Sequence, residues 1–287
     1  MNKINRPKFC DSIAITNLVS NTSLGHHGSI MNCLPLLKSA YKEYIRKAGI
    51  PDKNNYTALT KAAGDALIYY YSHPPKSHNE INNIRKKDSN SLCPMCGSMH
   101  RGTLDHVLPK NNFPEFAIFS RNLVPACKCN FVKGKTSTNG AGARILHPYY
   151  DKILGKRLIS AKFDSLSRIP TIDIKILLSN NHPLYQSVVF HVDEIVKKND
   201  ILGYLSEQWE MFYLHPESVI RGLTPRLTEP ANYFKLLKKE LLLLDKKHKG
   251  KNNWNSVFVS GLYSRTICTW VLTELQSSNR DTDGILI

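Results

Sequence analysis

The chain has 287 residues, 41% of them hydrophobic and 22% charged, a composition that excludes an unfolded polar chain and fits a globular protein with a sizeable core. Thirty-nine Lys and Arg residues against 23 Asp and Glu residues leave a formal net charge of +16, which favours a polyanionic partner, nucleic acid before an anionic membrane. No stretch approaches the ~20 apolar residues of a membrane span, and the first residues lack the apolar run of a secretory signal, so we expect a cytoplasmic protein without a membrane partner.

Helical patterns dominate the N-terminal part of the chain. Residues 1–33 have weak periodicity and many Asn, Ser and Gly residues, so we expect an irregular lead-in. Apolar residues then recur at helical spacing over 34–48 and again over 56–71. The sequence HPPK breaks the second pattern, and a short basic helix or linker follows it. We therefore predict a helical N-terminal region over 1–90.

The C-terminal part, 151–287, begins with strand patterns and continues with helical ones. Apolar and polar residues alternate over 172–176, which indicates a strand, and the run SVVFHV over 187–192 is its predicted partner after a turn. Three helices are predicted after this hairpin: 199–212, 231–247 and 255–275. The fold class that follows is α+β, with helices before and after a small cysteine-rich centre over 91–150.

Four of the seven cysteines crowd into this centre, as CPMC (Cys93, Cys96) and CKC (Cys127, Cys129). In a cytosolic protein such crowding favours a metal over disulfides, and the C-x-x-C spacing lets two thiolates of one turn reach one zinc ion. Zinc knuckles usually have two residues between paired cysteines, whereas the second pair here has one. Whether both of its sulfurs bind zinc, or His100 replaces one of them, stays open at this point.

LDHVLPK and FPEF stand between the cysteine pairs, NLVPACKCN contains the second pair, and KGK follows. This order resembles the HNH branch of the ββα-metal (His-Me finger) endonucleases, in its zinc-binding form. The match extends from Cys93 to Lys135. The resemblance implies a β-hairpin, a loop through 113–119 and a short helix that begins near Asn130.

The resemblance also implies a set of site residues. Asp105 and Asn130 would hold a catalytic Mg²⁺ or Mn²⁺ ion, and both side chains offer the oxygen that hard cations prefer. A neutral His106 would act as the general base that takes the proton of the attacking water. Asn122 would hold the loop that orients this histidine. Lys133 either reaches a substrate phosphate or is a solvated helix residue.

A looser resemblance concerns the whole chain. Two N-terminal helices, the central unit, LHPYYD and the terminal NNWNSVFVSGL are similar to HNH proteins of bacterial anti-phage systems of the Septu-type and retron-linked kinds. It implies a regulatory ATPase or another defence-system protein as partner. We thus expect a metal-dependent endonuclease that hydrolyses phosphodiester bonds in DNA. An RNA nuclease, for example on tRNA, and a zinc-stapled nucleic-acid-binding adaptor without turnover are the alternatives.

Overall fold

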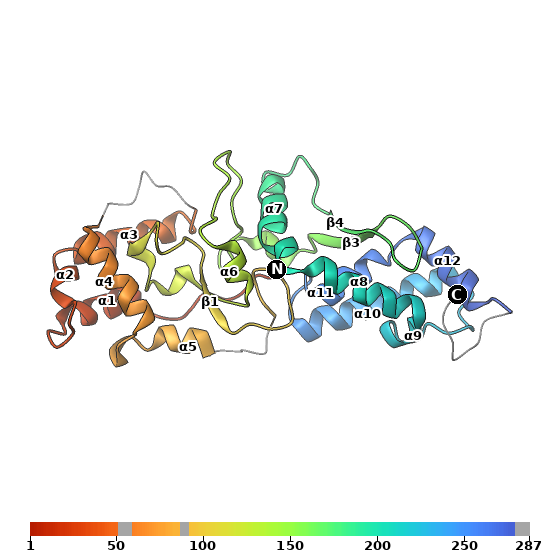
Figure 1. Cartoon of the computed structure of the whole chain (residues 1–287), viewed down its shortest axis with the longest axis horizontal. Coiled ribbons are helices and arrows are strands. Elements are labelled where there is room, and N and C mark those ends of the chain that lie inside the picture. Colours follow the sequence, from red (N-terminus) through yellow and green to blue (C-terminus); the bar gives the residue numbers. More distant parts are fainter. Residues whose placement is uncertain (51–58, 87–91, 279–287) are drawn as a thin grey trace.

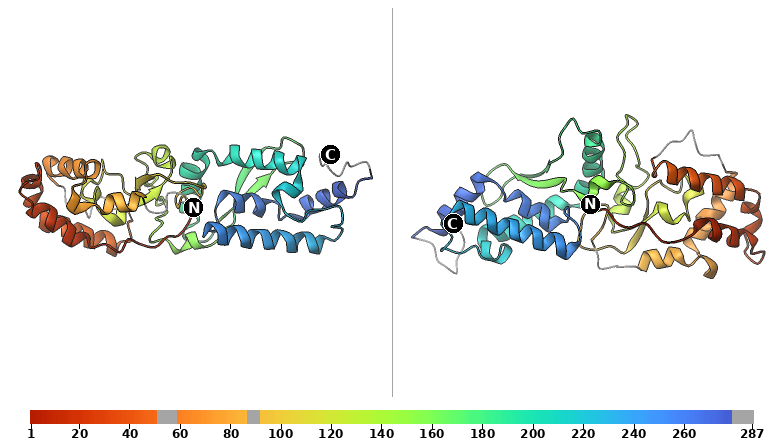
Figure 2. Two further views of the ribbon diagram at one scale, coloured as in Figure 1. Left: turned by 90° about the horizontal axis from the view of Figure 1, so that it is seen from below. Right: turned by 180° about the vertical axis from the view of Figure 1, so that it is seen from behind.

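The computed structural model describes residues 1–50, 59–86 and 92–278. The fold is α+β: helices surround two small antiparallel hairpins along an elongated molecule (Figure 1). The N-terminal helices lie at one end, the C-terminal helices at the other, and the first hairpin lies between them together with the N-terminus. Views from below and from behind keep the two ends apart on either side of the centre (Figure 2).

The described part of the N-terminal region contains five α-helices and a 3-10 helix (Lys76–His78), and its core also receives residues from the centre. The helices are α1 (Asp11–Ser20), α2 (His27–Met31), α3 (Leu34–Arg46), α4 (Lys61–Ser72) and α5 (Glu80–Lys86). Tyr41 and Tyr44 of α3 contact Phe116 and Phe119 of the central loop, with the rings of Tyr41 and Phe119 stacked at 4.2 Å. The helices are therefore anchored by the aromatic residues of the loop that the sequence motif FPEF begins.

Two predictions for this region need correction. The expected irregular lead-in over 1–33 is wrong, because α1 and α2 lie in it; Ala14, Ile15 and Leu18 recur at helical spacing and are buried. The helix predicted over 34–48 is confirmed as α3. The predicted second helix agrees with α4, although its first residues, 56–58, lie outside the described residues. The short basic segment forms helix α5 as far as Lys86, and its end also lies outside them.

The centre contains a short hairpin followed by one helical turn. Strand β1 (Thr103–His106) pairs antiparallel with β2 (Leu123–Ala126), and α6 (Cys129–Lys133) follows directly. The register places Asp105 opposite Val124 and His106 opposite Leu123. Each strand has only four residues, so this unit buries little apolar surface of its own and depends on its neighbours for stability.

The C-terminal region is built on a second hairpin, β3 (Ile159–Phe163) with β4 (Ile172–Ile176). The strand predicted over 172–176 is confirmed, but its predicted partner is wrong: 187–192 lies largely in helix α7 (Tyr185–His191), and β3 takes that place. Val188 and Val192 stand at helical spacing and are buried, so a β-branched run was mistaken for a strand.

The remaining helices of this region are α8 (Ile201–Leu214), α9 (Pro216–Val219), α10 (Pro230–His248), α11 (Trp254–Gly261) and α12 (Arg265–Leu275). They confirm two predicted helices, 199–212 and 231–247, whereas the one predicted over 255–275 is divided in two, since Ser264 is extended before α12. None of the described helices is long and apolar enough to cross a membrane.

Candidate functional site

Four cysteine side chains converge beside the hairpin of β1 and β2. The Sγ atoms of Cys93, Cys96, Cys127 and Cys129 all lie within 4.8 Å of one another, and all four residues are buried. The Cys93–Cys129 and Cys96–Cys127 distances are 3.7 and 3.4 Å, close to the ~3.8 Å edge of a tetrahedron with Zn–S bonds of about 2.3 Å. His100 is exposed and is not in this group. The cluster can therefore hold a metal ion with both sulfurs of the C-x-C pair.

Hydrogen bonds to sulfur favour a charged cluster. The backbone amides of Ser98 and Cys129 donate to the sulfurs of Cys96 and Cys127 at 3.4 and 3.3 Å. The amide of the Asn199 side chain donates to both of these sulfurs, at 3.2 and 3.5 Å. Hydrogen bonds with the thiols of Cys129 and Cys93 lower the pKa of the Cys127 thiol. Sequence reasoning missed Asn199, because nothing in its local sequence links it to cysteines that lie 72 and 103 residues earlier.

The C-terminal region contacts the same cysteine turn from two helices. At the start of α11, the indole N–H of Trp254 donates to the carbonyl of Cys96 at 2.9 Å, and its backbone N–H donates to Gly97 at 3.2 Å. At the end of α7, Nε2 of His191 lies 2.7 Å from the carbonyl oxygen of Met95. The turn is therefore held between the hairpin and the C-terminal helices.

A buried ion pair joins the hairpin to α6. The Nζ atom of Lys133 donates to Oδ1 of Asp105 at 2.9 Å and to the carbonyl of His106 at 2.7 Å, and the lysine is only 2% exposed. The alternative that Lys133 is a solvated helix residue is therefore wrong. Its predicted contact with a substrate phosphate stays a prediction, and that contact requires the ammonium group to leave or share Asp105.

The residues predicted to hold a divalent cation lie at this junction. Oδ2 of Asp105 is buried, and none of the described residues donates a hydrogen bond to it. Burial raises the pKa of this carboxyl, and Lys133 opposes that shift. The Nδ2 atom of Asn130 donates to the carbonyl of Leu104 at 2.9 Å. An unpartnered carboxylate oxygen is a donor of the kind that hard cations prefer, but Lys133 already neutralises this carboxylate through its other oxygen.

The His106 ring is fixed in one orientation by a backbone carbonyl. Its Nε2 atom lies 2.9 Å from the carbonyl oxygen of Ala117. Since a carbonyl oxygen only accepts, Nε2 carries the proton and Nδ1 keeps a lone pair. Burial lowers the pKa of His106 to about 3, helped by the charges of Lys110 and Lys133. The ring is therefore neutral at neutral pH.

Asn122 holds the loop that orients His106. It is fully buried, its side-chain oxygen accepts from Leu108 N at 2.8 Å, and its amide donates to the carbonyls of Leu108 and Phe116 at 3.0 and 3.2 Å. Phe116 directly precedes Ala117, which receives the His106 ring. The geometry thus fits the supporting role that was predicted for Asn122.

A second layer supports Asn122 from the N-terminal helices. The Tyr44 hydroxyl donates to the Asn122 side-chain oxygen at 3.0 Å and lies 2.9 Å from Nε2 of His147. Asp151 accepts from the backbone N–H of His147 at 2.6 Å. Burial lowers the pKa of His147 to about 3, so it is a neutral packing residue of the motif LHPYYD.

One exposed aromatic side chain stands on α6, next to the predicted site. Phe131 is 76% exposed although it follows Asn130 directly, and Lys128 and Lys135 on either side of it are exposed too. Aromatic rings between lysines are typical of surfaces on which nucleic-acid bases stack. Sequence reasoning missed Phe131; the alternation of Lys128, Phe131 and Lys135 could have indicated it.

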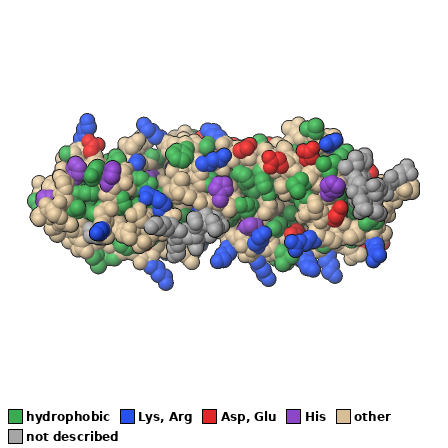
Figure 3. Space-filling view, turned by 60° about the horizontal axis from the view of Figure 1, so that its bottom comes forward, with side chains coloured by type: hydrophobic (Ala, Val, Ile, Leu, Met, Phe, Trp, Pro, Cys, Tyr) green, Lys and Arg blue, Asp and Glu red, His purple; other side chains and the backbone are tan. Residues whose placement is uncertain are grey.

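Positive charge is spread beyond the centre. Figure 3 shows Lys and Arg side chains gathered along one edge of the C-terminal half, where α10 alone exposes five lysines: Lys235, Lys238, Lys239, Lys246 and Lys247. With a net charge of +16 for the chain, such an edge attracts polyanions over a range of about one Debye length, ~8 Å at physiological salt.

Comparison with known proteins yields one similarity. The chain is 39% identical to Protein ea31 of Escherichia phage lambda over a match that covers 42% of this chain. The match covers 57% of the length of that phage protein. No protein-family model matches the chain, and no solved structure is similar to it.

Proposed function

We propose that this protein is a metal-dependent HNH endonuclease that hydrolyses phosphodiester bonds in DNA. The observation that carries the proposal is the His106 ring, whose proton is fixed on Nε2 by Ala117 and whose Nδ1 is left to accept a proton. The ring stands directly after Asp105, on a hairpin followed by a short helix and braced by four cysteines. A protein that only binds nucleic acid does not need an oriented proton acceptor that follows, in the sequence, a buried carboxylate with an unpartnered oxygen.

Each residue of the motif has a role in the proposed reaction. Nδ1 of His106 accepts a proton from the attacking water, and Asn122 keeps the loop that orients the ring. Asp105 and Asn130 would hold Mg²⁺ or Mn²⁺, which when bound stabilises negative charge on the phosphate and the leaving oxygen. Lys133 exchanges its contact with Asp105 for a substrate phosphate. The cysteine cluster would hold Zn²⁺ as a structural brace.

The Asp105–Lys133 ion pair favours a second candidate function. With Nζ of Lys133 only 2.9 Å from Asp105, the carboxylate already has a cationic partner inside the chain. If this pair persists when nucleic acid is bound, the protein is a zinc-stapled nucleic-acid-binding adaptor without turnover. The net charge of +16 is equally compatible with a nuclease and with an adaptor. Only a measurement of nuclease activity distinguishes the two functions.

The deciding experiment incubates the purified protein with plasmid DNA and with total RNA, in the presence of Mg²⁺ or Mn²⁺. We expect nicking or cutting of the plasmid, and a loss of at least about 100-fold in rate for His106→Ala. The matched control is His100→Ala, which changes an exposed histidine outside the motif and should keep the parental rate. Equal rates for the parent and His106→Ala would remove the assigned base. Preferred cutting of RNA would replace DNA as the substrate.

A regulatory partner belongs to the same proposal, since the looser resemblance to defence-system nucleases implies an ATPase or another protein that controls cleavage. The similarity to a phage protein lends no support to this narrower role. Purification of the tagged native protein from its host, followed by mass spectrometry, tests it. A stoichiometric ATPase in the eluate would support the role, whereas full nuclease activity of the isolated chain would argue against control by a partner.

A further inference from the structure

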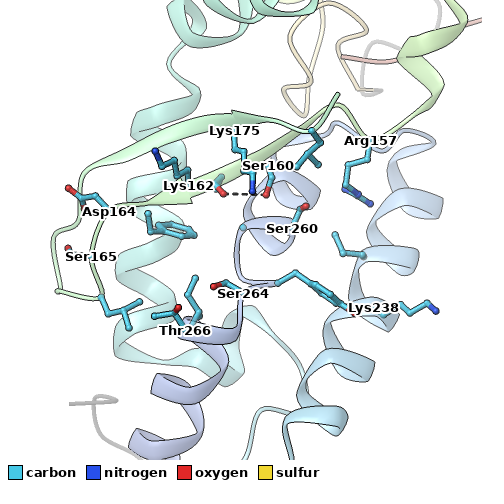
Figure 4. Close-up of a pocket in the computed structure, with 18 residues that line it drawn as sticks. Arg157, Ser160, Lys162, Asp164, Ser165, Lys175, Lys238, Ser260, Ser264 and Thr266 are labelled. Atoms are coloured by element: carbon cyan, nitrogen blue, oxygen red, sulfur yellow. Dashed lines mark hydrogen bonds between the residues drawn. The ribbon is translucent and has the colours of Figure 1, made fainter. Parts of the chain in front are cut away.

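A cavity of about 810 Å³ lies in the C-terminal region, away from the hairpin of β1 and β2. Its walls come from the β3–β4 hairpin, from α10 and from the segment where α11 ends and α12 begins (Figure 4). A Cβ atom on Gly261, at the end of α11, would lie 2.7 Å from the Cβ of Ala161 on β3. The helix therefore rests directly on the hairpin and closes this side of the cavity.

The polar part of the cavity is cationic and rich in hydroxyl groups. Lys175 projects from β4 toward Ser160 and Ser260 and remains exposed to solvent, whereas Lys162 and Lys238 lie at the margins of the cavity and point outward (Figure 4). Within the part of the chain that the structure describes, these three lysines form no ion pair.

The opposing negative charge around the cavity is small. Asp164 is the acidic residue of its lining, and it lies at the margin (Figure 4). Asp173, opposite Lys162 in the hairpin register, pairs with Lys197 at 2.8 Å instead. Arg157 also lines the cavity, but its charge is balanced by Asp245 at 2.8 Å. The lining thus has an excess of positive charge that its own carboxylates do not neutralise.

Hydroxyl donors and apolar side chains complete the lining. Among the described residues, no hydrogen-bond partner is present for the hydroxyls of Ser260, Ser264 and Thr266. The apolar side chains come from both hairpin and helices: Phe163, Leu166, Leu241, Tyr263 and Ile267. A ligand that fits this lining has a compact anion at one end and a flat, largely apolar ring at the other.

We propose that this cavity binds a nucleoside phosphate. Its phosphate lies against the Lys175 ammonium and the Ser260 hydroxyl, where a charge-assisted hydrogen bond forms. Its base lies against the aromatic and aliphatic wall. The volume is within the range of about 300–1,000 Å³ of sites for small molecules. This site shares no residue with the proposed nuclease centre.

The test is isothermal titration calorimetry of the full chain with AMP, GMP, CMP and UMP, with inorganic phosphate and with adenosine. We expect at least one mononucleotide to bind with a dissociation constant below about 1 mM. Lys175→Ala should weaken that binding about tenfold, because it removes the lysine that points toward Ser160 and Ser260 in Figure 4. Lys239→Ala changes an exposed lysine of α10 outside the lining and should bind as the parent does.

The outcomes are decisive in each arm. Absence of binding by all four mononucleotides at several millimolar overturns the proposal, as does parental affinity in a folded Lys175→Ala protein. Binding of inorganic phosphate as tight as that of the best nucleotide overturns the assignment of a nucleoside. Binding of adenosine as tight as that of AMP overturns the role assigned to the phosphate. His106→Ala should bind as the parent does, so this result is independent of the nuclease proposal.

Discussion

The central hairpin and the C-terminal region are stabilised in different ways. The centre has two four-residue strands and a cluster of buried side chains in which four members are cysteines. The C-terminal region instead buries a large continuous set of aliphatic and aromatic side chains around Trp209, Phe212 and Phe258. Apolar burial is extensive in the second, whereas the first buries little apolar surface and contains four cysteines that can hold a metal ion, which would add folding energy. The C-terminal core therefore contributes most of the apolar burial, whereas the centre positions the residues of the proposed reaction.

The largest expected effect is loss of a cysteine ligand. Cys127→Ser should remove the metal and lower the free energy of unfolding of the centre by on the order of 5 kcal/mol. Hydrogen exchange should then show lost protection over 92–150 and retained protection in α8 and α10. Cys268→Ser, a buried cysteine of the C-terminal core, is the matched control and should cost about 1 kcal/mol.

Chelators test the separate roles of the two metals. A zinc chelator should reproduce the Cys127→Ser result, whereas removal of Mg²⁺ alone should stop cleavage and leave the fold intact. Equal loss of structure under both treatments would contradict separate roles for the two metals, and equal loss in Cys127→Ser and Cys268→Ser would contradict the metal brace.

The next effect compares two fully buried asparagines, Asn122 in the centre and Asn252 in the C-terminal region. Asn252 holds its own loop, accepting from Leu158 N at 2.6 Å and donating to Lys156 O at 2.8 Å. Replacement of either by Ala leaves buried groups unsatisfied, so each should lose about 3 kcal/mol in urea unfolding. Only Asn122→Ala should lose plasmid cleavage at a temperature where both variants are folded. If Asn252→Ala loses as much activity, Asn122 acts on stability alone.

A smaller effect concerns pH and the N-terminal helices. Asp11 accepts from the backbone and hydroxyl of Ser120 at 2.8 Å, and burial raises its pKa from 3.8 to about 6. The folded state therefore holds this proton more tightly than the unfolded chain, and the resulting stability is present below about pH 4 and lost as the pH rises through about 6. Asp11→Asn should remove about 2 kcal/mol of this dependence, measured by urea unfolding across that range.

Glu115 also contributes to the pH dependence of stability, so Asp11→Asn should not remove all of it. Burial raises its pKa from 4.5 to about 7, which has the same sign, so part of the dependence should remain in Asp11→Asn. A variant whose stability falls with pH as steeply as the parent's would show that the Asp11 carboxyl is ionised at no net cost. Equivalent curves for Asp11→Asn and Glu115→Gln would assign the dependence to both groups.

The smallest effect is that of Phe131→Ala. Because Phe131 is 76% exposed, stability should be unchanged, whereas binding of single-stranded DNA should weaken about fivefold in fluorescence anisotropy. Leu242→Ala, on exposed residue Leu242 of α10 in the C-terminal region, should leave that binding unchanged. Equal affinity of the parent and Phe131→Ala would show that no base stacks on this ring.

The sequence predicted most helices and the cysteine cluster, because both depend on local spacing. Leu37, Tyr41 and Tyr44 mark a helix by their periodicity, and C-x-x-C brings two sulfurs to one turn. It also predicted the hairpin with Asp105 and His106 through a resemblance. Local spacing could not reveal long-range contacts, such as that of Asn199 with the sulfurs or the burial of Lys133 against Asp105. The run SVVFHV failed because β-branched residues suit either a strand or a buried helix.

Helix α11 connects the cysteine cluster to the cavity of the C-terminal region. Its first residue, Trp254, is bonded to the cysteine turn at Cys96, and its last, Gly261, forms part of the cavity wall. Eight residues span roughly 12 Å. A ligand that shifts one end of so short a helix would also shift the other end. Binding in the cavity would then change the affinity of the four cysteines for a metal ion, and metal binding would change the affinity of the cavity for its ligand by the same factor.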